Sequence, residues 1–212
     1  FKGAAELSNL LIDDPVNYFK LMATESGKFP AELSQVANNI HYSKTSEEWF
    51  MVKLLSPLTL ISFQSYLVNT LFLSLISFWG AWKLFLVFRD VLPEREDLAF
   101  FAVFLVPSSL FWGSGIMKDT ITLAGINYII YALYFSLYKR RFSLYKFVAV
   151  VLVSYIIFLL KGYVILAFLP GLLFGINELI KVNIRNAFIK RGLGSLLVIV
   201  TAVVIYIGPG IL

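Results

Sequence analysis

The sequence predicts an all-α, polytopic membrane protein. Hydrophobic residues make up 59% of the 212 residues and charged residues only 15%, with a mean hydropathy of +0.81. A soluble domain is nearer about 45–50% apolar and about a quarter charged. Several apolar runs also approach or exceed the roughly 20 residues that a helix needs to cross a bilayer. This composition excludes a soluble enzyme, a disordered protein and a nucleic-acid-binding domain, so we expect no nucleic-acid partner.

Residues 1–57 are predicted to form a separate segment of short amphipathic helices. The range contains no apolar run long enough to cross a bilayer. Asp14-Pro15 is typical of a helix start, with proline at the first helical position, and Pro30 starts a second helix. Thr45-Ser46-Glu47-Glu48 has the spacing of a capping box before an apolar run. We expect these helices to lie at a membrane surface or to pack on the membrane domain, residues 58–212.

Five apolar stretches follow, and they predict about six spans: 63–88, 98–116, 120–138, 147–180 and 193–212. The fourth stretch would measure about 51 Å as one helix, which is too long for a single span. We therefore expect a hairpin of two short helices that turns at Gly162. The chain begins without Met and ends inside an apolar run, so we expect a fragment of a longer polytopic protein, incomplete at both ends.

The orientation follows from the basic residues in the short connections. Ten Lys and Arg side chains fall in three connections, 89–97, 139–146 and 181–191. The other two connections hold one lysine each, Lys118 and Lys161. Cytoplasmic loops carry an excess of Lys and Arg, so the three basic loops are predicted to be cytoplasmic. Residues 1–57 are then outside, at the outer face of a bacterial inner membrane.

This orientation gathers the unusual polar and aromatic residues on the outer side: Asp13, Asp14, Trp112, Lys118, Asp119, Lys161 and Tyr163. Ionisable residues at or inside a membrane are costly and tend to be functional. A carboxylate of the Asp13-Asp14 pair could act as a general base toward a hydroxyl. The two lysines could hold the phosphate of a lipid-linked leaving group, with Asp119 and the aromatic rings contacting the substrate.

Each of these residues also has a purely structural interpretation. Asp14 before Pro15 could simply cap a helix, and Asp119 could cap the third span. Lys118 and Lys161 could extend to the headgroups from the ends of their spans. Trp112 could belong to the interfacial aromatic belt. The absence of Cys and the single histidine, His41, exclude Cys-bound and multi-His metal sites within the chain.

The stretch from Pro107 to Asp119, PSSLFWGSGIMKD, resembles a block of bacterial GT-C-type glycosyltransferases and their oligosaccharide-polymerase-like relatives. In these proteins, a span with Pro-Ser-x-x-Phe-Trp-x-Ser-Gly runs into an outward turn that carries a basic residue and an acid. The later Leu160-Lys161-Gly162-Tyr163, followed by Leu169-Pro170, is similar to a second element of the same proteins. The span that should precede the first outer loop is missing here, as expected for a fragment.

The resemblance implies a polyprenyl-phosphate sugar donor and a catalytic acid in the first outward loop, which corresponds to Asp13 or Asp14. Some of these proteins use a divalent metal, which is the one candidate cofactor. We therefore expect a membrane glycosyltransferase or polysaccharide-assembly protein with a lipid-linked substrate. A non-enzymatic accessory or scaffold subunit, bound to other membrane subunits, is the alternative. A transporter or channel is the weakest of the three readings, because the spans show no repeated pattern of broken helices.

Overall fold

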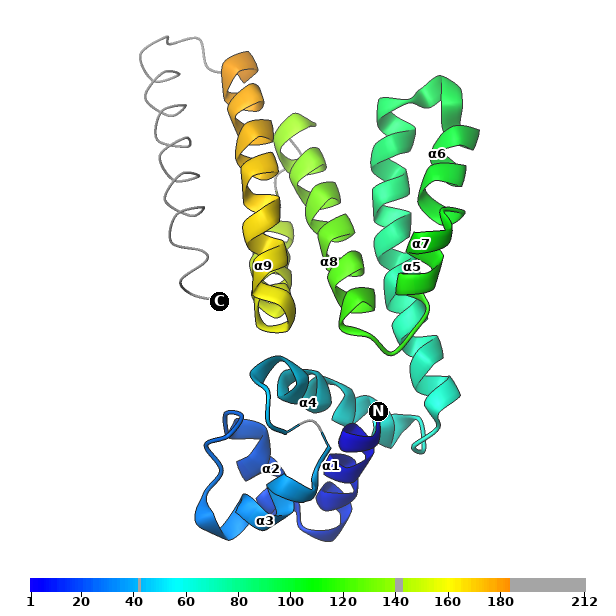
Figure 1. The fold of residues 1–212 in the computed structure, drawn as a ribbon. Helices are drawn as coiled ribbons and strands as arrows, with labels where there is room; N and C mark the ends of the chain where they lie inside the picture. The colour runs from blue at the N-terminus through cyan, green and yellow to red at the C-terminus, as the bar shows by residue number, and fades with distance from the viewer. Residues whose placement is uncertain (42, 140–142, 184–212) are drawn as a thin grey trace.

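The computed structural model describes residues 1–41, 43–139 and 143–183, and all regular structure in these ranges is helical (Figure 1). The elements in chain order are α1 (Lys2–Asp13), α2 (Pro15–Ala23), α3 (Ala31–Asn39), α4 (Ser46–Ile61), α5 (Tyr66–Val91), the 3₁₀ turn η1 (Pro93–Arg95), α6 (Glu96–Phe104), α7 (Pro107–Gly113), α8 (Lys118–Leu133), the π-helical turn η2 (Tyr134–Tyr138) and α9 (Leu144–Asn183). The predicted all-α class is confirmed.

Helices α1 to α4 form a small unit at one end of the molecule, below the longer helices in Figure 1. Its core joins all four helices through buried apolar side chains: Leu7, Tyr18, Leu21, Leu33, Ala37, Ile40, Trp49 and Val52. The Trp49 indole N–H donates to the carbonyl of Thr24 at 3.0 Å, so the largest core side chain also has its polar atom satisfied.

Helix α4 begins at the position of the predicted capping box. The Thr45 hydroxyl donates to the Glu48 carboxylate at 2.6 Å, but the Thr45 side chain caps no backbone N–H of the first turn, so the predicted capping box is not formed. About two turns after this start, the Lys53 ammonium donates to the carbonyl of Thr24 at 2.6 Å. Burial lowers the pKa of Lys53, and the nearby Glu25 carboxylate opposes that shift.

A tight elbow separates α4 from α5. Phe63 and Gln64 both have positive φ, 49° and 58°, which is uncommon for residues other than glycine. The buried Asn69 amide holds the elbow by donating to the Ser62 hydroxyl at 2.6 Å and to the Ser65 carbonyl at 3.0 Å. The first long apolar helix therefore starts at Tyr66, three residues after the start expected from the sequence.

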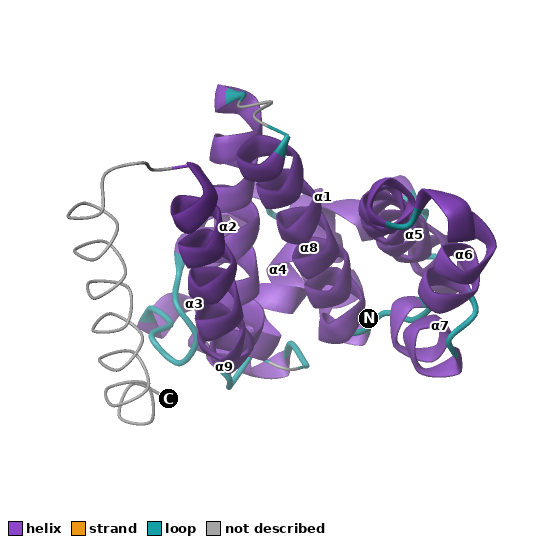
Figure 2. Ribbon diagram, turned by 90° about the horizontal axis from the view of Figure 1, so that it is seen from above, coloured by secondary structure: helices purple, strands orange, loops and turns teal. Residues whose placement is uncertain are grey.

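Helix α8 lies between α5 and α9 in both views of the fold (Figures 1 and 2). Small residues let these helices approach closely: Gly80 of α5 lies against the backbone of Ala124, and Gly125 faces Val153 and Ile157 of α9. Close packing through small residues is the usual way in which membrane helices associate, because lipid supplies no hydrophobic force between them.

Two of the described helices are long and apolar enough to cross a membrane, Tyr66–Val91 and Leu144–Phe168, which indicates a membrane protein. Pro93–Phe104 and Pro107–Gly113 would add a third span if this pair, bent by 51°, counts as one. The expected six spans are therefore not supported. Proline at the start of α7 divides the 98–116 stretch, and the 16 residues of α8 are short for a span. The stretch 193–212 lies outside the described residues.

The 147–180 stretch is broken close to the expected turn. Lys161, immediately before Gly162, has non-helical backbone angles (φ −155°, ψ 76°) inside α9. Figure 1 shows the yellow part of α9, around this break, near the α1–α4 unit, and its orange part at the opposite end. The first segment of α9 begins beside η2, also at that opposite end. The chain therefore turns back at Lys161.

Two of the basic connections meet at the end of the long helices that faces away from α1–α4. Asp90, at the end of α5, accepts a hydrogen bond from the Tyr134 hydroxyl at 2.6 Å and pairs with the Lys139 ammonium at 2.7 Å. Loop 89–97 and the described residues of loop 139–146 therefore share one end, as their charge predicts, whereas residues 140–142 and residues 184–191 of the third loop lie outside the described part.

Candidate functional site

The turn from α7 into α8 places two charged side chains beside the α1–α4 unit. Thr120 is buried, and its hydroxyl lies 2.9 Å from the carbonyl oxygen of Trp112 and 2.7 Å from that of Gly115. These contacts tie the first turn of α8 to the loop that precedes it. Lys118 and Asp119 are thereby fixed at the start of α8, at the end of the helix that faces α4 (Figure 1).

Lys118 connects the long helices to the α1–α4 unit. Its ammonium lies 2.9 Å from a carboxylate oxygen of Glu47, in the first turn of α4. The Lys118 side chain is 26% exposed and that of Glu47 is 45% exposed. Because water reaches both groups, this pair contributes little to stability and can be exchanged for another partner.

Asp119 makes the second ion pair, with the lysine at the break in α9. Its carboxylate lies 2.5 Å from the Lys161 ammonium, and the two side chains are 35% and 18% exposed. The Tyr163 ring centroid lies 5.9 Å from the same ammonium. This pair is less exposed than the first, so its loss should cost more.

The neighbourhood of this break is well packed. Leu160 is fully buried in a cluster with Met51 and Leu55 of α4 and Leu73 of α5. The cluster brings α4, α5 and α9 together beside the two ion pairs. We call the group formed by Glu47, Lys118, Asp119, Lys161 and Tyr163 the polar junction.

The structure does not bring the Asp13-Asp14 pair to the polar junction. Asp14 caps α2: one carboxylate oxygen accepts the Asn17 backbone N–H at 3.2 Å and the other accepts the Asn17 side-chain amide at 2.5 Å. Asp13 is exposed at the last residue of α1. The α1–α2 connection lies at the end of the small unit that faces away from α8 (Figure 1). The capping interpretation of Asp14 is therefore the one that the structure supports.

Trp112 lies on α7, next to the turn. Its ring is exposed and meets Phe111 edge-on at a centroid distance of 5.1 Å, while its carbonyl receives the Thr120 hydroxyl. Of the seven candidate residues, four come together: Lys118, Asp119, Lys161 and Tyr163. Trp112 is linked to their helix only through its carbonyl oxygen, which accepts the Thr120 hydroxyl.

Glu47 is the junction residue that sequence reasoning missed. It stands beside Glu48 in the predicted capping box, and Glu48 is the acid that the Thr45 hydroxyl contacts. The second acid, Glu47, was the feature of the sequence that could have indicated a further contact. Its partner Lys118, however, lies 71 residues away in the chain. Within the described ranges, no three His, Asp or Glu side chains gather so as to hold a metal ion. We therefore derive no step through a divalent metal.

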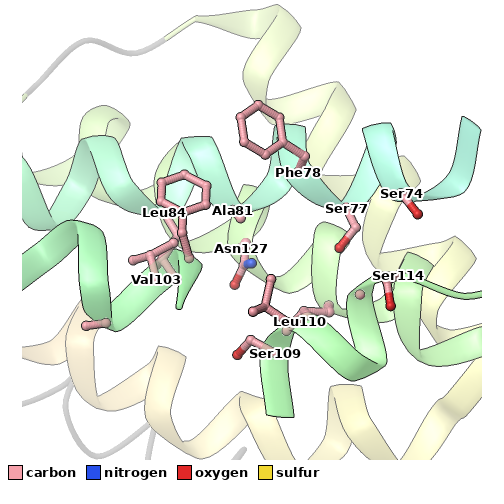
Figure 3. Close-up of a pocket in the computed structure, with 14 residues that line it drawn as sticks. Ser74, Ser77, Phe78, Ala81, Leu84, Val103, Ser109, Leu110, Ser114 and Asn127 are labelled. Atoms are coloured by element: carbon pink, nitrogen blue, oxygen red, sulfur yellow. The ribbon is translucent and has the colours of Figure 1, made fainter. Parts of the chain in front are cut away.

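A hollow adjoins the turn between α5, α6, α7 and α8 (Figure 3). Its volume is about 230 Å³, and its walls are mainly apolar, with Phe78, Leu84 and Leu110 among them. Ser114, one residue past α7, lies at one end of the hollow in Figure 3, and Leu84 and Val103 lie toward the other. The apolar space thus begins four residues before Lys118.

Known proteins do not assign this site. No protein-family model, curated protein or solved structure matches the chain. The features of the chain that indicate a function are the residues of the polar junction and the resemblance carried by residues 107–119.

Proposed function

We propose that this chain is a GT-C-like membrane glycosyltransferase or polysaccharide-assembly protein that uses a lipid-linked sugar donor. The observation that carries the proposal is the polar junction itself. Two lysines and two carboxylates, distant in sequence, meet where apolar helices end against a small helical unit. The adjoining apolar hollow between α5 and α8 offers space for part of a prenyl chain.

Such a transfer releases a proton from the acceptor hydroxyl and leaves negative charge on the donor phosphate, and the junction holds residues suited to each. Glu47, the more exposed carboxylate, would accept the proton of the acceptor hydroxyl. The acceptor oxygen would then form a bond to the anomeric carbon while the bond from that carbon to the donor phosphate oxygen breaks. The electron pair leaves with the prenyl phosphate, whose charge Lys118 and Lys161 would stabilise. Asp119 would position Lys161, and Asp13 and Asp14 have no role in this scheme.

The same proposal gives the chain an orientation. Loops 89–97 and 139–146 share one end and carry Lys and Arg, so the positive-inside rule puts that end in the cytoplasm. The α1–α4 unit and the polar junction would then lie at the outer face of a bacterial inner membrane. A lipid-linked donor would reach the junction from the outer leaflet.

Binding of a polyprenyl phosphate to the protein in detergent micelles tests the proposal. Lys118→Gln should weaken binding about tenfold, because it removes a charge-assisted contact to phosphate. Lys44→Gln, an equal charge change on the exposed surface of the small unit, should leave binding unchanged. A polyprenol without phosphate should bind the wild type and the Lys118→Gln variant equally. Equal affinity of both variants for the phosphate would contradict the proposal.

A scaffold role in a larger membrane complex is the second candidate, and one specific observation favours it. Both lysines already have carboxylate partners within the chain, and the Glu47–Lys118 pair fastens the small unit to the long helices. In this case the ion pairs of the junction hold the helices together and bind no substrate. Co-purification with a partner at fixed stoichiometry, together with wild-type lipid binding by Lys118→Gln, would select the scaffold role.

A further inference from the structure

A second hollow lies at the opposite end of the long helices. It measures about 550 Å³ and is lined by residues from the end of α5, the η1–α6 turn, α8 and η2, among them Arg89, Glu96, Tyr131 and Phe135. This end is where the basic loops meet. It is separate from the polar junction.

Two lysines approach the aromatic lining of this hollow from different helices. The Lys83 ammonium of α5 lies 4.9 Å from the Tyr131 ring centroid and 5.3 Å from that of Trp79. The Lys146 ammonium of α9 lies 5.5 Å from the same Tyr131 ring and 5.8 Å from that of Phe135. One tyrosine ring thus holds two ammonium groups that would otherwise repel each other.

The two carboxylates in the wall of the hollow, Asp90 and Glu96, do not pair directly with these cations. Among the described residues, Lys83, Arg89 and Lys146 form no ion pair with Asp or Glu. Asp90 also lines the hollow but is engaged by Tyr134 and Lys139. Glu96 is exposed in the η1–α6 turn. Arg89 is thus the basic residue in the wall of the hollow, and Lys83 and Lys146 lie over the Tyr131 ring that forms another part of the wall.

Lys83 occupies an unusual position for a charged residue. It lies within Tyr66–Val91, one of the two helices suited to crossing a membrane, where an ionisable residue usually marks a functional site. The neighbouring Tyr134–Tyr138 turn is π-helical. This form is rare overall, but where it occurs it often lies at a functional site.

We propose that this group, Lys83, Arg89, Tyr131, Phe135 and Lys146, binds the phosphodiester headgroup of an anionic membrane phospholipid. Such headgroups lie at the level where long apolar helices end, and basic pockets between membrane helices bind them. The lysines and Arg89 would contact the phosphate. The aromatic rings would lie at the boundary between headgroup and acyl chain, where they are favoured.

Native mass spectrometry of the detergent-solubilised protein with equimolar phosphatidylglycerol and phosphatidylcholine tests this site. The wild type should prefer phosphatidylglycerol by about tenfold or more, since each nearby basic residue contributes about 1 kcal/mol, or about fivefold. The combined variant Lys83→Gln, Arg89→Gln and Lys146→Gln should bind both lipids equally. Lys83→Arg with Lys146→Arg should keep the preference.

A matched control has the same change in charge on the small unit: Lys2→Gln, Lys20→Gln and Lys44→Gln. It should keep the wild-type preference. If the triple glutamine variant fails to fold, Arg89→Gln alone, at an exposed position, should still lower the preference severalfold. An unchanged preference in the variants of the site, or an equal loss in the control, would overturn the proposal. Displacement of the lipid by millimolar inorganic phosphate would also overturn it, because the site would then belong to a soluble anion.

Discussion

Replacing Gly80 by leucine should force α5 and α8 apart and lower the free energy of unfolding by about 3 kcal/mol. A Cβ atom at this position would lie 2.6 Å from Cα and 2.7 Å from the carbonyl oxygen of Ala124. Those atoms belong to the α8 backbone, so the clash cannot be relieved by turning a side chain. Reversible unfolding in mixed detergent micelles would measure the change.

The matched control for this substitution is Gly171→Leu. Among the described residues, no atom lies within 4 Å of a Cβ at Gly171, so the same change in size meets no neighbour there. We expect its free energy of unfolding to equal that of the wild type or to rise slightly, since leucine favours a helix more than glycine does. Equal destabilisation by both variants would show that the close α5–α8 contact is not what the Gly80 substitution disrupts.

Removing one partner of the Asp119–Lys161 pair should cost about 2 kcal/mol of stability, between the values for exposed and fully buried pairs. Asp119→Asn leaves the Lys161 ammonium, only 18% exposed, without its counter-charge. The double variant Asp119→Asn with Lys161→Gln should recover most of that loss. A double-mutant cycle measures the coupling between the two side chains directly.

The Glu47–Lys118 pair provides the comparison for that cycle. Both of its side chains are more exposed, so Glu47→Gln should change stability by less than about 1 kcal/mol. Equal coupling energies for the two pairs, or no coupling between Asp119 and Lys161, would contradict the description of Asp119–Lys161 as the structural pair of the junction.

The local features of the fold follow from short-range chemistry and are predictable from sequence. Asp14-Pro15 starts α2, where the Asp14 carboxylate accepts the Asn17 backbone N–H, because capping depends only on residues a few positions apart. The break at Lys161 adjoins the glycine that signalled it. The apolar composition likewise predicts helices suited to a bilayer.

The span count could not be predicted because hydropathy alone does not show where a helix bends. The stretch 98–116 is apolar throughout, yet Pro107 starts a new helix at 51° to the preceding one. In the next stretch, α8 gives way to a π-helical turn after 16 residues. Both departures are changes of backbone geometry within apolar sequence, and mean hydropathy does not record them.

The candidate site was predicted in part for a related reason. The orientation argument places Lys118, Asp119, Lys161 and Tyr163 on one side, and the structure brings them together. The same argument cannot resolve distances within that side. Asp13 and Asp14 share the side but lie at the far end of the small unit, whereas Glu47 meets Lys118 through tertiary packing alone.

The most direct test of a lipid-phosphate site at the polar junction is to map where a donor analogue binds. A polyprenyl phosphate with a photoreactive group next to the phosphate would be cross-linked to the protein in micelles, and the labelled peptides identified by mass spectrometry. Labels in 107–119, in 45–53 or in 160–163 are the predicted result. Labels confined to other segments, or labelling that excess polyprenyl phosphate does not suppress, would contradict the assignment of the junction as the substrate site.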